Sequence, residues 1–208
     1  MKFYFANAIA GAFMFFAIPA HADLITNGGF ETGDFTGWAL GQNSSNFIVT
    51  NGCAAYGFCD FDDVSAALNS GGTDTSPLTA SLSQQITDTA GQILDLAFLF
   101  AFGFSVDHQT TLNSDQIFQV YWDGQLIDQV NTRSALSDSR LFQLVATGND
   151  TLEFAVTTTD PFVAWGLDDV SLNPEQQEVP EPGSLGLFLL ALSGLIAFSV
   201  RQNKHRVS

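Results

Sequence analysis

The stretch Ile93-Leu-Asp-Leu-Ala-Phe-Leu-Phe-Ala-Phe-Gly-Phe104 decides the fold. Its large apolar side chains recur at every second position, at Leu94, Leu96, Phe98, Phe100, Phe102 and Phe104. A period of two places successive side chains on opposite faces of an extended chain, whereas a helix repeats every ~3.6 residues. The pattern therefore favours a core strand of a β-sandwich over a buried helix.

Shorter strand patterns flank this stretch on both sides. Alternating, β-branched or aromatic runs occupy Phe47–Thr50, Leu78–Ile86, Ile117–Trp122, Leu126–Val130, Leu141–Ala146, Thr151–Thr157 and Phe162–Leu172. Turn residues separate the runs at intervals of roughly ten residues, and Asp123-Gly124 is a strong hairpin signal. We expect an all-β fold, a two-sheet antiparallel β-sandwich of the jelly-roll type. An N-terminal signal helix and a C-terminal single transmembrane helix are expected to flank it.

The first 22 residues have the pattern of a signal peptide. Lys2 precedes the apolar run Phe3–Ile18, and Ala20-His21-Ala22 offers the small-x-small pattern that a signal peptidase needs. Cleavage after Ala22 leaves Asp23 at the mature N-terminus. The alternative is an uncleaved membrane anchor, but the run is short for a membrane span and ends at a cleavage-like site.

A sandwich domain is expected over residues 23–172, followed by a polar linker over residues 173–178. Residues 23–178 hold 21 of the 22 acidic residues, but of the six basic residues only Arg133 and Arg140, which gives a net charge of −19. Such a surface excludes nucleic acid as a partner. It suits an exported protein that stays soluble and holds calcium.

Two cysteines, Cys53 and Cys59, close a short loop in this domain. In an oxidising compartment this spacing favours a disulfide. A zinc site needs more Cys or His ligands, and His108 is the single histidine of residues 23–178. A redox-active pair usually has two intervening residues rather than five.

The C-terminal residues 179–208 combine three features of a sorting tail. The motif Val179-Pro180-Glu181-Pro182 is followed by the apolar stretch Gly183–Val200 and by three basic residues, Arg201, Lys204 and Arg206. As a helix the stretch is about 27 Å long, just enough for a bilayer core of roughly 30 Å. The basic end is expected to stay in the cytoplasm.

This tail resembles the PEP-CTERM sorting signal of Gram-negative bacteria. The resemblance implies processing by an exosortase, a membrane cysteine enzyme that acts at the motif, after a transient stage in the inner membrane. It also implies delivery to the cell surface or the extracellular matrix. The alternative is an ordinary single-span anchor that follows a chance pair of prolines.

Two stretches at opposite ends of the domain, Asn27–Trp38 and Trp165–Leu172, resemble the first and last strands of galactose-binding-like and carbohydrate-binding jelly rolls. In such folds these strands lie near each other and often hold a structural calcium. The resemblance implies a calcium site with Glu31 and Asp168 as side-chain ligands, assisted by the backbone carbonyl of Asn27 or Gly29.

The alternation of the last strand supports one of these ligands. Asp168 shares its parity with Val170 and Leu172, so it is expected to point toward the core, where a carboxylate needs a cation or hydrogen bonds. Asp169 completes the candidate set but is expected to point the opposite way. The alternative is that Glu31 and Asp168 only cap turns.

The domain shows no combination of nucleophile, base and orienting residue, so we expect a protein that is not an enzyme. Glu153 has no second acid in a local motif, as a glycosidase would need. Aromatic rings that stack on sugars are the usual glycan contacts, and the candidates are Tyr121, Trp38 and Trp165.

Three functions stay open. The favoured one is an exported, non-catalytic protein associated with the cell envelope or the exopolysaccharide matrix. The second is a carbohydrate-binding module that binds a glycan directly. The third is a glycoside-active enzyme.

Overall fold

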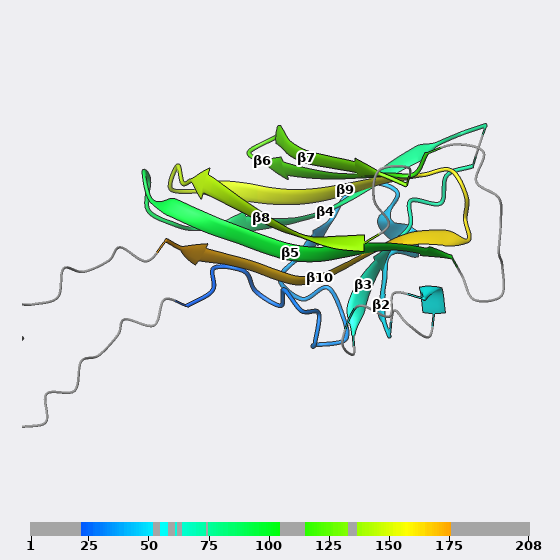
Figure 1. Cartoon of the computed structure of the whole chain (residues 1–208), viewed down its shortest axis with the longest axis horizontal. Coiled ribbons are helices and arrows are strands. Elements are labelled where there is room, and N and C mark those ends of the chain that lie inside the picture. Colours follow the sequence, from blue (N-terminus) through cyan, green and yellow to red (C-terminus); the bar gives the residue numbers. More distant parts are fainter. Residues whose placement is uncertain are drawn as a thin grey trace, which may run out of the picture. The chain divides into compact units, whose positions relative to one another are not determined.

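The protein is described by a computed structural model that covers residues 22–51, 55–57, 61, 64–73, 75–104, 115–132 and 137–175. Two antiparallel five-stranded sheets form a sandwich, which confirms the predicted fold class (Figure 1). The elements in chain order are β1 (Ala39–Leu40), the 3₁₀ helix η1 (Ser44–Asn46), β2 (Ile48–Thr50), β3 (Ser65–Leu68), β4 (Leu78–Ile86), β5 (Ile93–Phe104), β6 (Ile117–Trp122), β7 (Gln125–Asn131), β8 (Ser137–Val145), β9 (Asp150–Thr158) and β10 (Val163–Pro174).

The chain crosses between the sheets from one strand to the next. One sheet has the order β1-β4-β9-β6-β7 and the other the order β2-β3-β10-β5-β8, so β3, β4 and β5 alternate between them, as do β7, β8, β9 and β10. Among the strands of the described residues, the β6–β7 hairpin alone keeps two consecutive long strands in one sheet. Its turn residues Asp123 and Gly124 both have positive φ angles, 50° and 74°. The predicted Asp-Gly hairpin turn is confirmed.

The core lies between the two sheets and is dominated by aromatic rings. Phe98, Phe100, Phe118, Phe154 and Trp165 are each at most 1% exposed. The Phe98 and Phe154 ring centroids lie 5.2 Å apart with edge-to-face geometry, and Phe100 stacks on Phe118 at 5.5 Å. The alternation predicted for residues 93–104 accounts for this packing, because every second residue from Leu94 to Phe100 is buried.

Strand β3 was not predicted from the sequence. Its residues Ser65-Ala-Ala-Leu68 have no β-branched or aromatic side chain, yet all four are buried. The reason lies on the outer face of this sheet, where Phe61 packs in a second small cluster with Ala67, Ala101 and Ala164. The alanines that contact Phe61 have low strand propensity, so the sequence pattern did not predict this strand.

All core residues lie between Ile25 and Leu172, and the compact unit that contains the sandwich ends at Pro174. The core formed by the described residues thus belongs to this one unit, and we expect the sandwich to fold when it is produced without the terminal segments. Residues 1–21 and 176–208 lie outside the described part, as do Cys53 and Cys59, so the structure does not test the signal peptide, the transmembrane helix or the disulfide. Among the described residues, no helix is long and apolar enough to span a bilayer.

Candidate functional site

Tyr121 lies on the face of the β1-β4-β9-β6-β7 sheet that points away from the core. Phe118, Val120 and Trp122 are buried on β6, and the residues between them are half-buried, as the alternation predicts. The antiparallel register places Tyr121 opposite Glu153 of β9, and Glu153 opposite Ser83 of β4. Paired side chains in such a ladder have their Cβ atoms about 5 Å apart. An aromatic ring and a carboxylate are therefore neighbours on this face.

Polar side chains continue the face beside this pair. Gln119 lies opposite Ala155 of β9 and Gln129 of β7, and its Nε2 donates a hydrogen bond of 2.8 Å to Oε1 of Gln129. Ala155 has a small side chain, so the larger groups stand around it. We call this set the Tyr121 face, and it comprises Ser83, Gln119, Tyr121, Gln129, Glu153 and Ala155.

The sequence prediction missed Gln119 and Gln129. The alternation of β6 places Gln119 on the same side as Tyr121, so this signal was present. Gln129 needed the β6–β7 register, which contains an irregularity between Val120 and Tyr121 that the sequence does not reveal.

The other two aromatic candidates are wrong, because both rings are core residues. Trp165 is 0% exposed and packs against Phe100 and Phe118 at centroid distances of 6.0 and 5.6 Å. Trp38 is 8% exposed, stacks on Phe30, and donates from Nε1 to the Asn27 carbonyl at 3.1 Å. Neither ring approaches the surface as a sugar platform must.

The first and last segments of the domain lie side by side. Leu24 donates its backbone N–H to the carbonyl of Leu172 at 2.9 Å, and Val170 donates to the carbonyl of Gly28 at 3.1 Å. This pairing brings the predicted calcium residues together. A Cβ atom built on Gly29 would lie 3.7 Å from Cγ of Glu31, 3.9 Å from Oδ1 of Asp168 and 4.0 Å from Oδ1 of Asp169.

The predicted orientation of Asp168 is wrong. Leu167 and Val170 both belong to the core, and a register shift lies between Asp168 and Ser171. The left-handed Asp169, with φ of 49°, forms this bulge and breaks the alternation. Asp168 thus shares the outward side of β10, yet it is only 4% exposed, and its Oδ1 accepts a hydrogen bond from the N–H of Asp169 at 2.8 Å.

The fit to calcium is partial. Near Gly29 the Oδ1 atoms of Asp168 and Asp169 offer the oxygen chemistry that calcium prefers, whereas Glu31 approaches with its Cγ. The Asn27 carbonyl, however, already accepts hydrogen bonds from Trp38 and Phe30. Within the described ranges no three Asp, Glu, His or Cys side chains stand close enough to form a metal centre by themselves. Calcium therefore stays a prediction.

A second group of carboxylates was not predicted. Asp88 of the β4–β5 loop, Asp123 of the β6–β7 turn and Asp150 at the start of β9 interact with one another, and Asp150 is 0% exposed. Burial and the neighbouring Asp150 raise the pKa of Asp88 to about 6. Burial also acts to raise the pKa of Asp150, but hydrogen bonds with Asp123, Thr147 and Asp88 hold it at about 2.

These opposite shifts indicate one proton shared by Asp88 and Asp150: as the pH falls, Asp88 takes up the proton while Asp150 stays ionised and accepts a hydrogen bond from it. Oδ2 of Asp88 is buried, and as a carboxylate oxygen it meets no hydrogen-bond donor in the described part of the chain. When Asp88 is protonated, this oxygen can donate to Asp150, whose two oxygens already accept from the amide and hydroxyl of Thr147. The sequence did not reveal the cluster because its members come from a loop, a turn and the start of a strand that are far apart in the chain.

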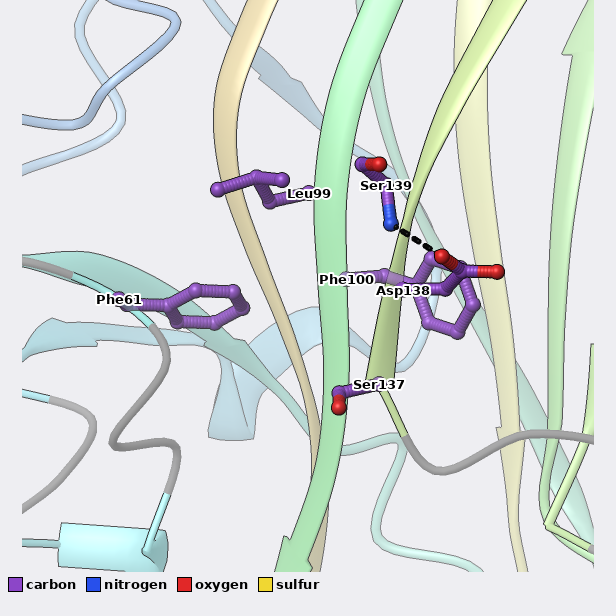
Figure 2. Close-up of a pocket in the computed structure, with 6 residues that line it drawn as sticks. All are labelled: Phe61, Leu99, Phe100, Ser137, Asp138 and Ser139. Atoms are coloured by element: carbon purple, nitrogen blue, oxygen red, sulfur yellow. Dashed lines mark hydrogen bonds between the residues drawn. The ribbon is translucent and has the colours of Figure 1, made fainter.

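A shallow depression of about 250 Å³ lies on the other sheet. Figure 2 shows Phe61 on one side of β5 and the β8 residues Ser137, Asp138 and Ser139 on the other, with the Ser139 N–H bonded to Asp138. The two rings that line it, Phe61 and Phe100, are only 7% and 1% exposed. Because neither ring offers a free face, the depression is a poorer sugar site than the Tyr121 face.

Comparisons with known proteins identify the tail and the fold. Residues 178–204 match the PEP-CTERM protein-sorting motif. The chain carries a PEP-CTERM sorting tail. The match contains the Val179–Pro182 motif, Arg201 and Lys204, and ends before Arg206. The PEP-CTERM motif marks an exported protein that an exosortase processes. No curated protein matches the chain.

Solved structures with a similar fold support the sandwich that precedes the PEP-CTERM tail. The structure of TmCBM61 in complex with beta-1,4-galactotriose is 19% identical, with a TM-score of 0.51, and the match covers 74% of this chain and 99% of that one. Arabinose-bound MgGH51 α-L-arabinofuranosidase is 11% identical, with a TM-score of 0.50, over 76% of this chain and 27% of that one. At these identities the likeness establishes the fold.

Proposed function

We propose that this chain is an exported, non-catalytic protein of the cell envelope or exopolysaccharide matrix of a Gram-negative bacterium, and that its sandwich binds glycans through the Tyr121 face. The observation that carries the proposal is the pairing of a half-buried aromatic ring with amide and carboxylate side chains on one face of a rigid sheet. Sugar rings stack on aromatic rings, while their hydroxyl groups need donors and acceptors of this kind.

The fold and the tail add independent support. A sandwich of this architecture holds galactotriose in the TmCBM61 complex, so the fold is compatible with glycan binding. The PEP-CTERM match supports export. In the proposed route, signal peptidase removes residues 1–22, the apolar tail holds the chain briefly in the inner membrane, and exosortase then releases the acidic domain toward the surface.

The absence of catalysis is part of the proposal. The outward neighbours of Glu153 in the register and along β9 are Ser83, Tyr121, Thr151 and Ala155, none of which is an acid. Glycosidases use two carboxyl groups about 5–9.5 Å apart. These neighbours do not supply the second one, so we assign Glu153 to ligand contact rather than to acid–base chemistry.

Glycan-array binding by purified residues 23–178 tests the binding proposal. Tyr121→Ala is expected to reduce the affinity roughly 5- to 150-fold, because loss of a stacking ring removes about 1–3 kcal/mol of contact. Phe162→Ala is the matched control, since Phe162 is an aromatic residue 39% exposed in the β9–β10 connection. If the two variants lose binding equally, or if the wild-type domain binds no glycan, the proposal fails.

A separate experiment tests the route. Deletion of residues 179–182 from the full-length chain removes the motif but leaves the apolar stretch and the basic end. We expect the deleted chain to stay in the inner-membrane fraction at its unprocessed size, whereas the intact chain is shortened and released. Release of both chains at the same size would contradict exosortase processing.

A further inference from the structure

The charge of the domain restricts the glycans that it can bind. Residues 23–178 carry a net charge of −19 and contain no lysine. Polyanionic glycans such as polyuronates would be repelled by this field, because like charges that approach a surface meet an unfavourable potential. Neutral and positively charged glycans meet no such barrier. The bulk charge by itself does not distinguish these two classes.

The position of Glu153 distinguishes them. Glu153 lies next to the Tyr121 ring, half-buried on the outward face, where a bound sugar would contact both side chains. No basic side chain of the described residues lies beside it. Arg140 is held on the other sheet by ion pairs with Asp128 and Asp138, and its guanidinium lies 4.9 Å from the Phe100 ring centroid.

The geometry points to a glycan that carries free amino groups, recognised by the Tyr121 ring against the sugar and by the Glu153 carboxylate on the ammonium. This inference rests on the proposed function and names the class of ligand for the same face. Glu153, which has no basic partner among the described residues, would gain a charge-assisted hydrogen bond from an ammonium, and its partly buried position would strengthen that bond. An N-acetylated sugar of the same shape offers a neutral amide instead.

Isothermal titration calorimetry with four short probes tests the inference on residues 23–178, with the full-length chain in detergent as a second sample. The probes are a β-1,4-glucosamine tetramer, its N-acetylated counterpart, a galacturonic acid tetramer and a lysine tetrapeptide. At 0.15 M salt the Debye length is about 8 Å, so charges distant from the face contribute little. We expect the glucosamine tetramer to bind roughly tenfold more tightly than the N-acetylated one, and the galacturonic acid tetramer not to bind.

Variants assign the preference to a residue. Glu153→Gln keeps the shape and hydrogen-bonding capacity of the side chain, and it is expected to reduce the preference to less than about threefold. Asp95→Asn is the matched control, because it removes the same charge from the outward side of β5 on the opposite sheet. Tyr121→Ala is expected to weaken binding of both sugar tetramers and to leave the lysine peptide unaffected.

The outcomes separate this inference from the proposed function. Equal affinity for the amino and N-acetylated tetramers overturns the amine specificity and leaves glycan binding intact. Equal losses in Glu153→Gln and Asp95→Asn, or lysine peptide binding as tight as that of the glucosamine tetramer, assign the effect to overall charge and also overturn it. Failure of both sugar tetramers and of the glycan array overturns the proposed function itself.

Discussion

Replacing Asp88 with asparagine should stabilise the domain, and the effect should depend on pH. Oδ1 of Asp88 accepts the N–H of Gly148 at 2.9 Å, and the asparagine oxygen can keep this bond. The asparagine amide would then replace the buried Oδ2, which lacks a donor, and would donate to Asp150 at every pH. The variant mimics the protonated form of Asp88 permanently.

The pKa of Asp88 sets the size and sign of the effect. It rises from an ordinary value of 3.8 to about 6 in the folded domain. The folded state therefore binds this proton more tightly than the unfolded state does. The stability that the bound proton contributes is complete below pH 3.8 and is lost as the pH rises through about 6. A shift of about two units corresponds to about 3 kcal/mol, or about 2 kcal/mol after allowance for the partial exposure of Asp88.

Thermal unfolding of residues 23–178 at pH 4 and pH 8 measures this difference. Asp88→Asn is expected to raise the Tm by about 4–8 °C at pH 8 and to change it little at pH 4. Asp34→Asn is the control, because hydrogen bonds from Thr36 and Thr32 lower the pKa of Asp34, so neutralising it should bring no gain at pH 8. An equal shift at both pH values, or a loss at pH 8, would refute the shared proton.

Three further predictions concern stability. Gly28→Ala should destabilise the domain by about 2–4 kcal/mol in urea unfolding, because the new Cβ would lie 1.8 Å from the Val170 carbonyl oxygen. Gly33→Ala is the control: its new Cβ would have no atom within 4 Å, so the variant should be destabilised only by the strain energy of its positive φ. Trp165→Ala should cost about 3–5 kcal/mol by the same assay, whereas a surface sugar contact would cost almost nothing. Calcium at ten times its Kd should raise the Tm by about 3–6 °C, an effect that Asp168→Asn abolishes; no shift at millimolar calcium would rule out the site.

The features predicted correctly from the sequence are those fixed by local pattern. The period of two over residues 93–104 is steric and independent of context, so strand β5 and its core face followed directly. The Asp123-Gly124 turn was equally local, because two successive positive φ angles demand such residues.

The errors arose where distant segments decide the outcome. The alternation of the last strand failed at Asp169, where a bulge is stabilised by the N-terminal segment that pairs with Val170. Trp38 and Trp165 were assigned to the surface because the local sequence does not show which way their rings point, and it is the packing of both sheets that buries them. The carboxylate cluster likewise needs a loop, a turn and a strand end to meet, which no local pattern contains.

The sorting tail and the Tyr121 face belong to different parts of the chain, so export by the tail and glycan binding by the face can be tested separately. Among the described residues the core extends from Ile25 to Leu172, and the compact unit ends at Pro174, before the PEP-CTERM match begins at residue 178. A tail variant that blocks release should therefore leave the glycan affinity of the domain unchanged. Conversely, Tyr121 faces away from the core, so its removal should leave folding and export intact. A Tyr121→Ala chain that is still processed and exported but no longer stays at the cell surface would show that glycan binding, rather than the tail alone, retains the protein there.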